Sequence, residues 1–359
     1  MPSKKRTISF AQAINEALSY SLKKDKNLIC YGLGVTDPKG IFGTTLNLHK
    51  KFGNKRVFDV PTSENALTGV AIGAALNGVR SVATHQRLDF FLLAMDQLVN
   101  AAAKWHYMFG SQISVPITIR LIVGRGWGQG PTHSQNLQAW FNHIPGLKVV
   151  MPTHPEDAKS LLIESIFDPN PVIFLEHRWL HNINGNIRNS LLKKKIGKSK
   201  VSIPGKDITI VSTSYLTIES MKASNYLKKN FNINPEVIDL ISIKPMDYGT
   251  IFKSLKKTGK ILVLDTGVHI NSVASEIISK IASKKFDYLK IAPDYLAMPD
   301  VPEPTGFSLT KKFHISQIEI VLKILEMLKI KVNKKKIISD LQSKTKFHDQ
   351  PDFGLIEPF

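Results

Sequence analysis

Short runs of apolar and β-branched residues alternate along the chain with longer amphipathic stretches. This alternation favours parallel α/β architecture, because the crossover between two parallel strands is usually a helix. Strands are predicted at residues 80–84, 115–123, 148–151, 171–176, 208–212, 236–240 and 260–265. Helices are predicted near residues 63–78, 89–106, 154–167, 216–229, 271–283 and 315–329. Since the strand runs are apolar at most positions, we expect both faces of the sheets to be buried.

The pattern divides into two α/β units, and a chain of 359 residues is long enough for two domains. Residues 191–206 are polar, lysine-rich and interrupted by glycine and proline, so we expect a linker there. We therefore predict a first domain over residues 1–190, a second over 207–330 and a basic C-terminal extension over 331–359. The tail of that extension, residues 348–359, either docks on a surface or is loosely ordered.

Three features bear on the cellular compartment of the protein: membrane spans, a signal peptide and cysteine pairs. The chain has no stretch of about 18 uninterrupted apolar residues, so a membrane span is not expected. The N-terminus is basic, but no apolar signal-peptide core follows it. Cys30 is the single cysteine, which excludes an intramolecular disulfide. We expect a cytoplasmic protein.

The formal net charge of +19 is large for a chain of this length. Lysines concentrate at residues 193–200 and 329–336. Nucleic-acid binding is one interpretation, but no nucleic-acid motif occurs and no aromatic residues are interleaved with the lysines. A composition rich in Lys, Ile and Asn explains the charge as solvated surface lysines. The field would also favour an acidic partner subunit or an anionic cofactor.

Glu64 is the most informative polar position. It follows Pro61 and Ser63, which indicate a turn and a helix N-cap, and it precedes a run of small residues that predicts a buried helix. Its carboxylate would lie near the positive end of the helix dipole and near the low-dielectric interior. Two interpretations stay open on local features: a functional carboxylate, or a residue that only caps its own helix.

Several sequence blocks, in a constant order and spacing, carry a family resemblance. They are Val57-Phe58-Asp59, Ser63-Glu64, residues 94–100, Ala102-Ala103-Lys104, His133-Ser134-Gln135, residues 145–150 and residues 168–172. With these blocks the chain resembles the β subunits of the thiamine-diphosphate-dependent 2-oxo acid dehydrogenases, the decarboxylating component of the pyruvate and branched-chain complexes. The resemblance implies two α/β domains: a parallel-sheet pyrimidine-binding domain and a transketolase C-terminal-like domain.

The resemblance implies that Glu64 is catalytic, with its carboxyl group hydrogen-bonded to the aminopyrimidine ring of thiamine diphosphate in a dry site. Phe90 falls at the position of the aromatic residue that stacks on this ring; the alternative is a plain core residue. Gln86 and Asp89 lie in the same segment, and Gln86 is expected to bind the cofactor. A glutamine at position 86 resembles the branched-chain class more than the pyruvate class, which has an apolar residue there. Thr84 replaces an acid common to both classes, so the identity of the 2-oxo acid substrate stays open.

His133 matches the family's active-site histidine at the mouth of the substrate channel, which assists acyl transfer. Its unperturbed pKa of ~6.5 suits proton transfer, although a histidine in a turn is often structural. The preceding glycine-rich run, residues 124–130, lacks the Lys-Ser/Thr of a P-loop and departs from the dinucleotide fingerprint. We expect Arg125, Trp127 and Gln129 to line the substrate channel at the active-site entrance.

The resemblance also concerns metal ions. The family's Mg²⁺ signature, Gly-Asp-Gly, does not occur in the chain, so Mg²⁺ and the cofactor diphosphate are expected on a separate α subunit. A monovalent cation, K⁺, is implied near Ile117, Ser165, Asp168 and Asn170, held largely by backbone oxygens. The alternative is a turn stabilised by the Asp and Asn side chains.

The sequence thus predicts the β subunit of an α₂β₂ heterotetramer. This enzyme would decarboxylate a 2-oxo acid oxidatively and acylate the lipoyl group of a partner acyltransferase. One alternative is a subunit of an acetoin-dehydrogenase-like or transketolase-like thiamine enzyme, for which no lipoyl acceptor is required. Another alternative is a non-catalytic scaffold that kept the fold. Neither a nucleic acid nor a membrane is expected as a partner.

Overall fold

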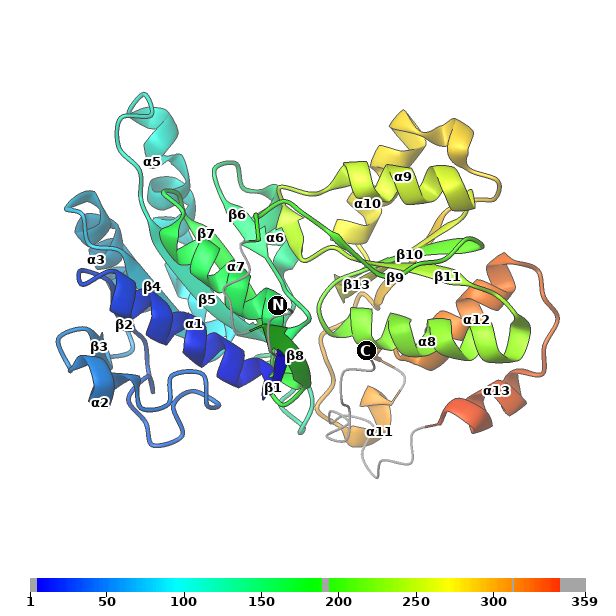
Figure 1. Cartoon of the computed structure of the whole chain (residues 1–359), viewed down its shortest axis with the longest axis horizontal. Coiled ribbons are helices and arrows are strands. Elements are labelled where there is room, and N and C mark those ends of the chain that lie inside the picture. Colours follow the sequence, from blue (N-terminus) through cyan, green and yellow to red (C-terminus); the bar gives the residue numbers. More distant parts are fainter. Residues whose placement is uncertain (1–4, 189–193, 312, 343–359) are drawn as a thin grey trace.

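The computed structural model describes residues 5–188, 194–311 and 313–342, so the tail at 348–359 lies outside the described residues. Within these ranges the chain forms two α/β units that lie side by side (Figure 1). In the described residues, the sheet of the first unit has seven strands in the order β12-β6-β7-β5-β4-β2-β3. They are β2 (Ile29–Tyr31), β3 (Val57–Phe58), β4 (Ser81–His85), β5 (Ile117–Val123), β6 (Lys148–Val150), β7 (Val172–His177) and β12 (Ser242–Lys244).

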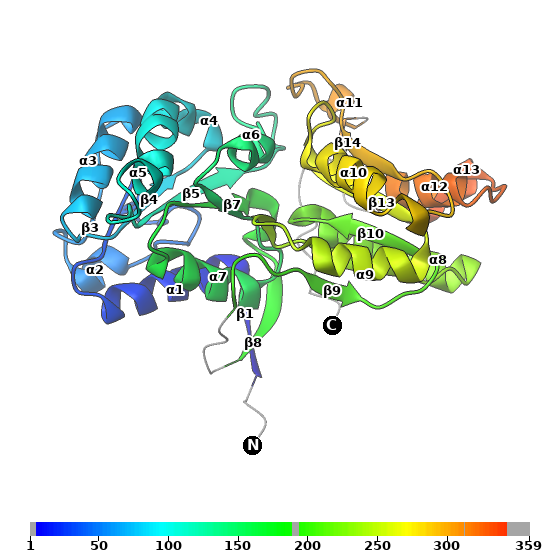
Figure 2. The same ribbon diagram turned by 90° about the horizontal axis from the view of Figure 1, so that it is seen from above.

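Neighbouring strands of the first sheet are parallel, except that β12 runs antiparallel to β6. Helices cover both faces (Figure 2). One face carries α1 (Phe10–Lys24) and α7 (Pro155–Phe167), and the other carries α3 (Glu64–Leu76), α5 (Ala103–Met108) and α6 (Gln138–His143). The predicted α/β class is confirmed.

Burial on both faces follows from the alternation of side chains along each strand. In β7, Val172 and Phe174 join the core under α1 and α7. Ile173 and Leu175, from the same strand, join the core under α3 and α6. The apolar strand runs therefore supply two cores at once, as their uninterrupted pattern predicts.

Two helices differ from their sequence pattern. The helix predicted over residues 89–106 is divided into α4 (Leu88–Phe91), a 3₁₀ turn (Leu92–Ala94), a π-helical segment (Gln97–Ala102) and α5. The hydrophobic period does not show these breaks, because buried side chains still recur every three or four residues. The helix that begins at Glu64 is buried on one face only, and Val70 on its other face is 67% exposed.

The second unit holds a five-stranded sheet of order β14-β13-β10-β11-β9 in the described residues. Its strands are β9 (Lys200–Ile203), β10 (Ile208–Ser212), β11 (Pro235–Asp239), β13 (Ile261–Val268) and β14 (Asp294–Met298). In Figure 1, one face carries α9 and α10 and the other carries α8 and α12. These helices, with two further ones, are α8 (Tyr215–Phe231), α9 (Tyr248–Thr258), α10 (Val273–Lys284), α11 (Phe307–Thr310), α12 (Gln317–Met327) and α13 (Lys334–Leu341).

The two units are joined more closely than a linker between separate domains predicts. Residues 200–203, within the expected linker, form strand β9 of the second sheet. Strand β12 follows β11 in sequence but completes the edge of the first sheet. The Met151 amide donates to the Ile241 carbonyl at 2.7 Å beside this strand. A two-stranded ribbon of β1 (Lys5–Ser9) and β8 (Asn184–Arg188) closes the first unit.

Helix length and apolar character bear on membrane insertion. Across the described ranges, no helix is both long and apolar enough to cross a bilayer.

Candidate active site

The candidate site lies at the carboxyl edge of the first sheet. Because β2, β3, β4, β5 and β7 are parallel, the segments that follow them meet at one edge. A recess at this edge is lined by segments after three strands: residues 32–33 after β2, residues 60–64 after β3 and residues 86–90 after β4. The predicted Glu64, Gln86 and Phe90 all face this recess.

Glu64 is the first residue of α3, and Ser63 occupies the N-cap position without a side-chain hydrogen bond to the helix. Glu64 is partly buried. In the part of the chain that the structure describes, its carboxylate makes no hydrogen bond and no ion pair. The helix N-terminus and the recess therefore present a carboxylate that is available to a ligand.

Gln86 and Phe90 frame the opposite side of the recess. The Gln86 side-chain amide donates from Nε2 to the Leu33 carbonyl at 3.0 Å, which orients its oxygen away from that contact. Phe90 is 38% exposed, although the preceding strand β4 is mostly buried. An exposed ring and an oriented amide suit the binding of a flat heteroaromatic group.

A buried ion pair supports the wall behind the recess. Arg120 donates to Glu176 through Nε at 2.6 Å and through Nη2 at 2.9 Å, and both side chains are fully buried. Arg120 Nη1 also donates to the Thr84 hydroxyl at 3.3 Å, and Thr84 lines the recess. Burial opposes ionisation of Glu176, but Arg120 and His181 outweigh it and hold the pKa of this carboxyl below its usual value.

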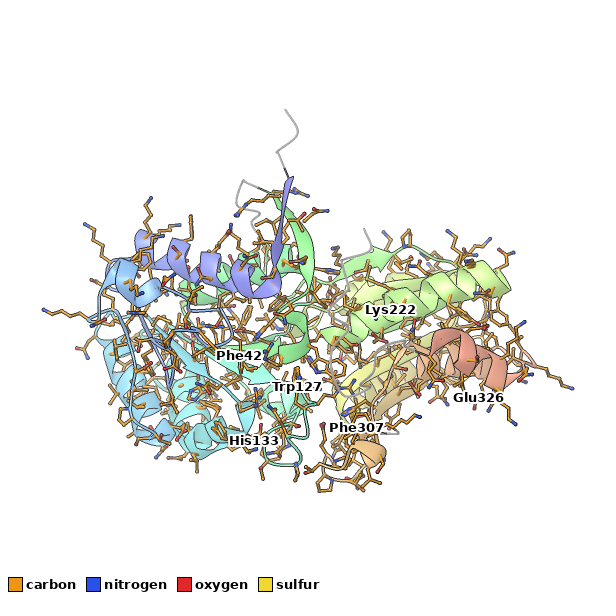
Figure 3. The ribbon with its side chains drawn as sticks, turned by 90° about the horizontal axis from the view of Figure 1, so that it is seen from below. Phe42, Trp127, His133, Lys222, Phe307 and Glu326 are labelled. Carbon is orange, nitrogen blue, oxygen red and sulfur yellow. The ribbon has the colours of Figure 1, made fainter. Side chains whose placement is uncertain are left out.

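His133 lies beside the recess rather than inside it. Its ring stands edge-on to Phe90, with ring centres 5.4 Å apart, and it is exposed (Figure 3). Its Nδ1 lies 3.0 Å from the Thr132 hydroxyl, whereas Nε2 makes no hydrogen bond to the described residues. The loop that carries His133 is held by Asp89, whose Oδ1 accepts from the Gln135 backbone N and Nε2 at 3.3 and 2.9 Å.

The three residues expected in the substrate channel lie in different surroundings. Arg125 is buried, with its guanidinium 4.2 Å from the centre of the Trp179 ring, and faces a small cavity between the two units. Trp127 is 37% exposed. Gln129 accepts from Arg87 Nη2 at 2.7 Å. None of the three residues lines the Glu64 recess.

Of the four residues expected near a monovalent cation, Asp168 has its carbonyl and its carboxylate bonded to cationic side chains. Arg80 Nη1 donates to the carbonyls of Ile166 and Asp168 at 3.3 and 3.2 Å. Lys148 forms an ion pair with the Asp168 carboxylate, and the Asn170 amide donates to the same carboxylate. A K⁺ ion on these oxygens would lie beside two like charges. These contacts are typical of a stabilised turn, and the K⁺ site near Ile117, Ser165, Asp168 and Asn170 stays a prediction.

Sequence reasoning missed the contact made by Asp89 and did not identify Arg178 or Phe42, which also shape this edge. Asp89 was placed in the right segment, but its bond to the His133 loop depends on tertiary contact. Arg178 directly follows β7, and a polar residue at a strand end was a usable signal. Phe42 packs against Arg178 from a loop without any hydrophobic period, so no sequence pattern indicates it.

Comparison with known proteins assigns the fold to a class. The model for "Transketolase, pyrimidine binding domain" matches residues 6–182, and the model for "Transketolase, C-terminal domain" matches residues 197–320. A solved split-gene transketolase, described as an inactive β4 tetramer, has a TM-score of 0.73 and 18% identity to this chain. The match covers 90% of this chain and 99% of that chain, and it shows the fold. The protein is a two-domain transketolase-like protein.

More similar sequences narrow the class. The pyruvate dehydrogenase E1 component subunit beta of Rickettsia bellii is 36% identical over 90% of this chain and 99% of its own length. That of Chaetosphaeridium globosum is 35% identical over 89% and 98%. The chain belongs to the family of the pyruvate dehydrogenase E1 component β subunits, which confirms the family predicted from the sequence. The β subunit of acetoin:2,6-dichlorophenolindophenol oxidoreductase from Cupriavidus necator is also 35% identical, over 88% and 96%.

Proposed function

We propose that this chain is the β subunit of an α₂β₂ 2-oxo acid dehydrogenase and that Glu64, Gln86 and Phe90 hold the aminopyrimidine half of thiamine diphosphate. The complete enzyme decarboxylates a 2-oxo acid oxidatively and passes the acyl group to the lipoyl group of a partner acyltransferase. The observation that carries the proposal is the convergence of these three side chains, from two separate strand ends, in one recess.

The residues of the recess fit one half of this cofactor. A flat pyrimidine ring requires an aromatic face, a carboxyl group at a ring nitrogen and a further polar group. Phe90, Glu64 and Gln86 offer these three features. The diphosphate and its Mg²⁺ require oxygen ligands, which the proposal assigns to the α subunit.

Bound thiamine diphosphate supplies the carbon nucleophile and the electron sink for decarboxylation. The chain's own residues would position the cofactor ring and transfer protons. Glu64 shares a proton between its carboxyl oxygen and a ring nitrogen, and Phe90 fixes the plane of the ring by stacking. The Thr132 hydroxyl engages Nδ1 of His133. Nε2 is therefore the nitrogen that transfers a proton at the entrance during acyl transfer.

The test is co-purification of the chain with candidate α subunits, followed by decarboxylation assays with a panel of 2-oxo acids. Activity should require both subunits, thiamine diphosphate and Mg²⁺. Glu64→Gln should lower kcat by roughly 10²- to 10⁴-fold without changing assembly, because the proton at the ring nitrogen is lost. Glu276→Gln is a matched control, since Glu276 is an exposed carboxylate in the first turn of α10. Full activity in Glu64→Gln would refute the assignment.

A second candidate function is favoured by the relative from Cupriavidus necator, whose name describes acetoin as substrate and a dye as electron acceptor. The same half-site would then cleave acetoin. Assays of the assembled enzyme with acetoin and with 2-oxo acids, each with a lipoyl domain or with 2,6-dichlorophenolindophenol as acceptor, separate the two functions. Turnover of acetoin alone would replace the first proposal.

A further inference from the structure

Arg178 is a partly buried cation that has no anionic partner among the described residues. It begins the 3₁₀ turn that directly follows β7, at the same sheet edge as the recess. Across the described ranges, its guanidinium makes no hydrogen bond and no ion pair. Its neighbours are aromatic: the guanidinium carbon lies 4.1 Å from the centre of the Phe42 ring and 5.5 Å from that of Trp127. Stacking on a ring leaves the N–H edge of a guanidinium free for oxygens.

A second arginine adds to the uncompensated charge. Arg87 lies 5.7 Å from the centre of the same Phe42 ring and donates to the Gln86 carbonyl at 3.0 Å and to Gln129 at 2.7 Å. Both acceptors are uncharged. Burial, together with the charge of Arg87, lowers the pKa of Arg178 to about 10. The charge of Asp89 acts on Arg87 and offsets part of its charge. Among the described residues, however, no carboxylate forms an ion pair with either guanidinium, so a bound anion would relieve the remaining repulsion.

The aromatic residues that flank Arg178 are held in an uncommon backbone conformation. Phe42 has φ of 57° and Trp127 has φ of 56°, and neither is glycine. Phe42 belongs to a run of four residues, 40–43, that all have positive φ. Hydrogen bonds hold this run, including Gly43 N to the Lys39 carbonyl at 2.8 Å. Left-handed conformations of bulky residues are rare and cluster at ligand sites.

The position of this group connects it to the proposed active site. Phe42 and Trp127 lie near the same face as His133 in Figure 3. Arg87 is the immediate neighbour of Gln86, which lines the recess, and Gln129 belongs to the loop that carries His133. Gln86 and Gln129 thus connect the arginines to the recess and to the His133 loop, while the arginines themselves are not among the residues that line the recess. Arg87 is only 8% exposed, which favours a small molecule over a protein surface as the source of the anion.

We propose that Arg178 and Arg87, framed by Phe42 and Trp127, bind a second anionic group of the substrate, a carboxylate or a phosphate that is not lost in the reaction. The substrate class is then a 2-oxo acid with an anionic side chain rather than pyruvate or a branched-chain acid. This inference rests on the proposed function for its substrate, while the anion site itself rests on the geometry alone.

The activity test uses the assembled enzyme with a dye as electron acceptor, so that no lipoyl domain is needed. Pyruvate and 2-oxoisovalerate represent neutral side chains; 2-oxoglutarate and a phosphorylated 2-oxo acid represent anionic ones. We expect kcat/KM to be highest for an anionic acid. Arg178→Gln should lower kcat/KM for that acid by roughly 10- to 100-fold and should change kcat/KM for pyruvate little. Arg188→Gln is the control, because Arg188 is an exposed arginine paired with Glu156 on strand β8.

A binding test does not depend on turnover. Inorganic phosphate and 2-oxoglutarate are titrated into the full-length chain, and the fluorescence of Trp127 reports binding, with Trp127→Phe identifying its signal. Arg178→Gln should weaken binding at least about 10-fold, and Arg188→Gln should not. If no 2-oxo acid is turned over but this binding persists, the anion site stands and the proposed function falls.

Two outcomes overturn the inference. One is that the enzyme prefers neutral acids, that kcat/KM is the same for the wild-type and Arg178→Gln enzymes, and that neither phosphate nor 2-oxoglutarate binds. The other is an Arg178→Gln enzyme that is normal with the dye but slow with a lipoyl domain. That result would assign the arginines to an acidic protein partner, while leaving the proposed decarboxylation intact.

Discussion

Arg120 lies within β5 and Arg178 directly follows β7, the neighbouring strand of the same sheet, but their electrostatic surroundings are opposite. Arg120, in β5, is fully buried and donates two hydrogen bonds to Glu176 in β7. Arg178 follows Glu176 by two residues; its guanidinium lies over two aromatic rings, is affected by the charge of Arg87, and forms no ion pair among the described residues. The compensated arginine is part of the scaffold, whereas the uncompensated one is available to a ligand. Charge compensation, rather than residue type, distinguishes the two roles.

The largest effect is expected from breaking the compensated pair. Glu176→Leu leaves the Arg120 guanidinium buried without a carboxylate, which should lower the free energy of unfolding by about 3–5 kcal/mol. Urea denaturation of the full-length chain measures this loss. The double variant Arg120→Met with Glu176→Leu is the control, because it removes both charges and should recover most of the stability. Equal losses in the single and double variants would contradict the pairing.

A second, smaller effect concerns pH and the third member of this network. Burial lowers the pKa of His181 below its ordinary 6.5, although Glu176 at 3.3 Å opposes the shift. The unfolded chain therefore takes up a proton below pH 6.5 that the folded chain takes up only at lower pH. Stability should fall as pH decreases from 6.5, by at most ~1.4 kcal/mol per pH unit for this group.

The measurement is urea denaturation of the wild-type and His181→Gln chains between pH 7.5 and 5. The variant should lose less stability over this range, because it lacks the titrating ring. His133→Gln serves as a matched control, since His133 is exposed. A wild-type chain whose stability does not respond to pH below 6.5, or a His181→Gln chain that responds identically, would count against a buried neutral imidazole.

The smallest effect on stability is expected at the uncompensated arginine. Arg178→Gln removes no ion pair, so the free energy of unfolding should change by less than about 0.5 kcal/mol. Phosphate should raise the Tm of the wild-type chain, because it binds the folded state, and it should not raise that of Arg178→Gln. Thermal unfolding with and without phosphate tests both statements. A loss as large as that in Glu176→Leu would abolish the distinction between the two arginines.

The sequence pattern was sufficient for the fold class, because alternating apolar runs and amphipathic helices report burial directly. It could not show that the helix predicted over residues 89–106 is divided, since its buried side chains keep a helical spacing through the π-helical segment. It also did not reveal that residues 242–244 return to the first sheet. Strand order depends on contacts between distant segments, and no local pattern carries that information.

For the candidate site, the sequence was most informative where family blocks are present. Glu64, Gln86 and Phe90 were singled out together, and the structure brings them to one recess. Arg125 was grouped with Trp127 because both lie in one glycine-rich run, yet it turns inward toward Trp179. Phe42 was not identified, because its role depends on a left-handed backbone that brings its ring to Arg178.

Strand β12 has a consequence for the order of events during synthesis. Residues 242–244 complete an edge of the sheet that begins with residues 29–31, so this edge of the first sheet remains open until β9, β10, α8 and β11 of the second unit have left the ribosome. Until then β6 presents unpaired backbone groups, which are a template for pairing with another chain. Nascent chains halted before residue 242 should therefore depend on chaperones more than chains halted after residue 244.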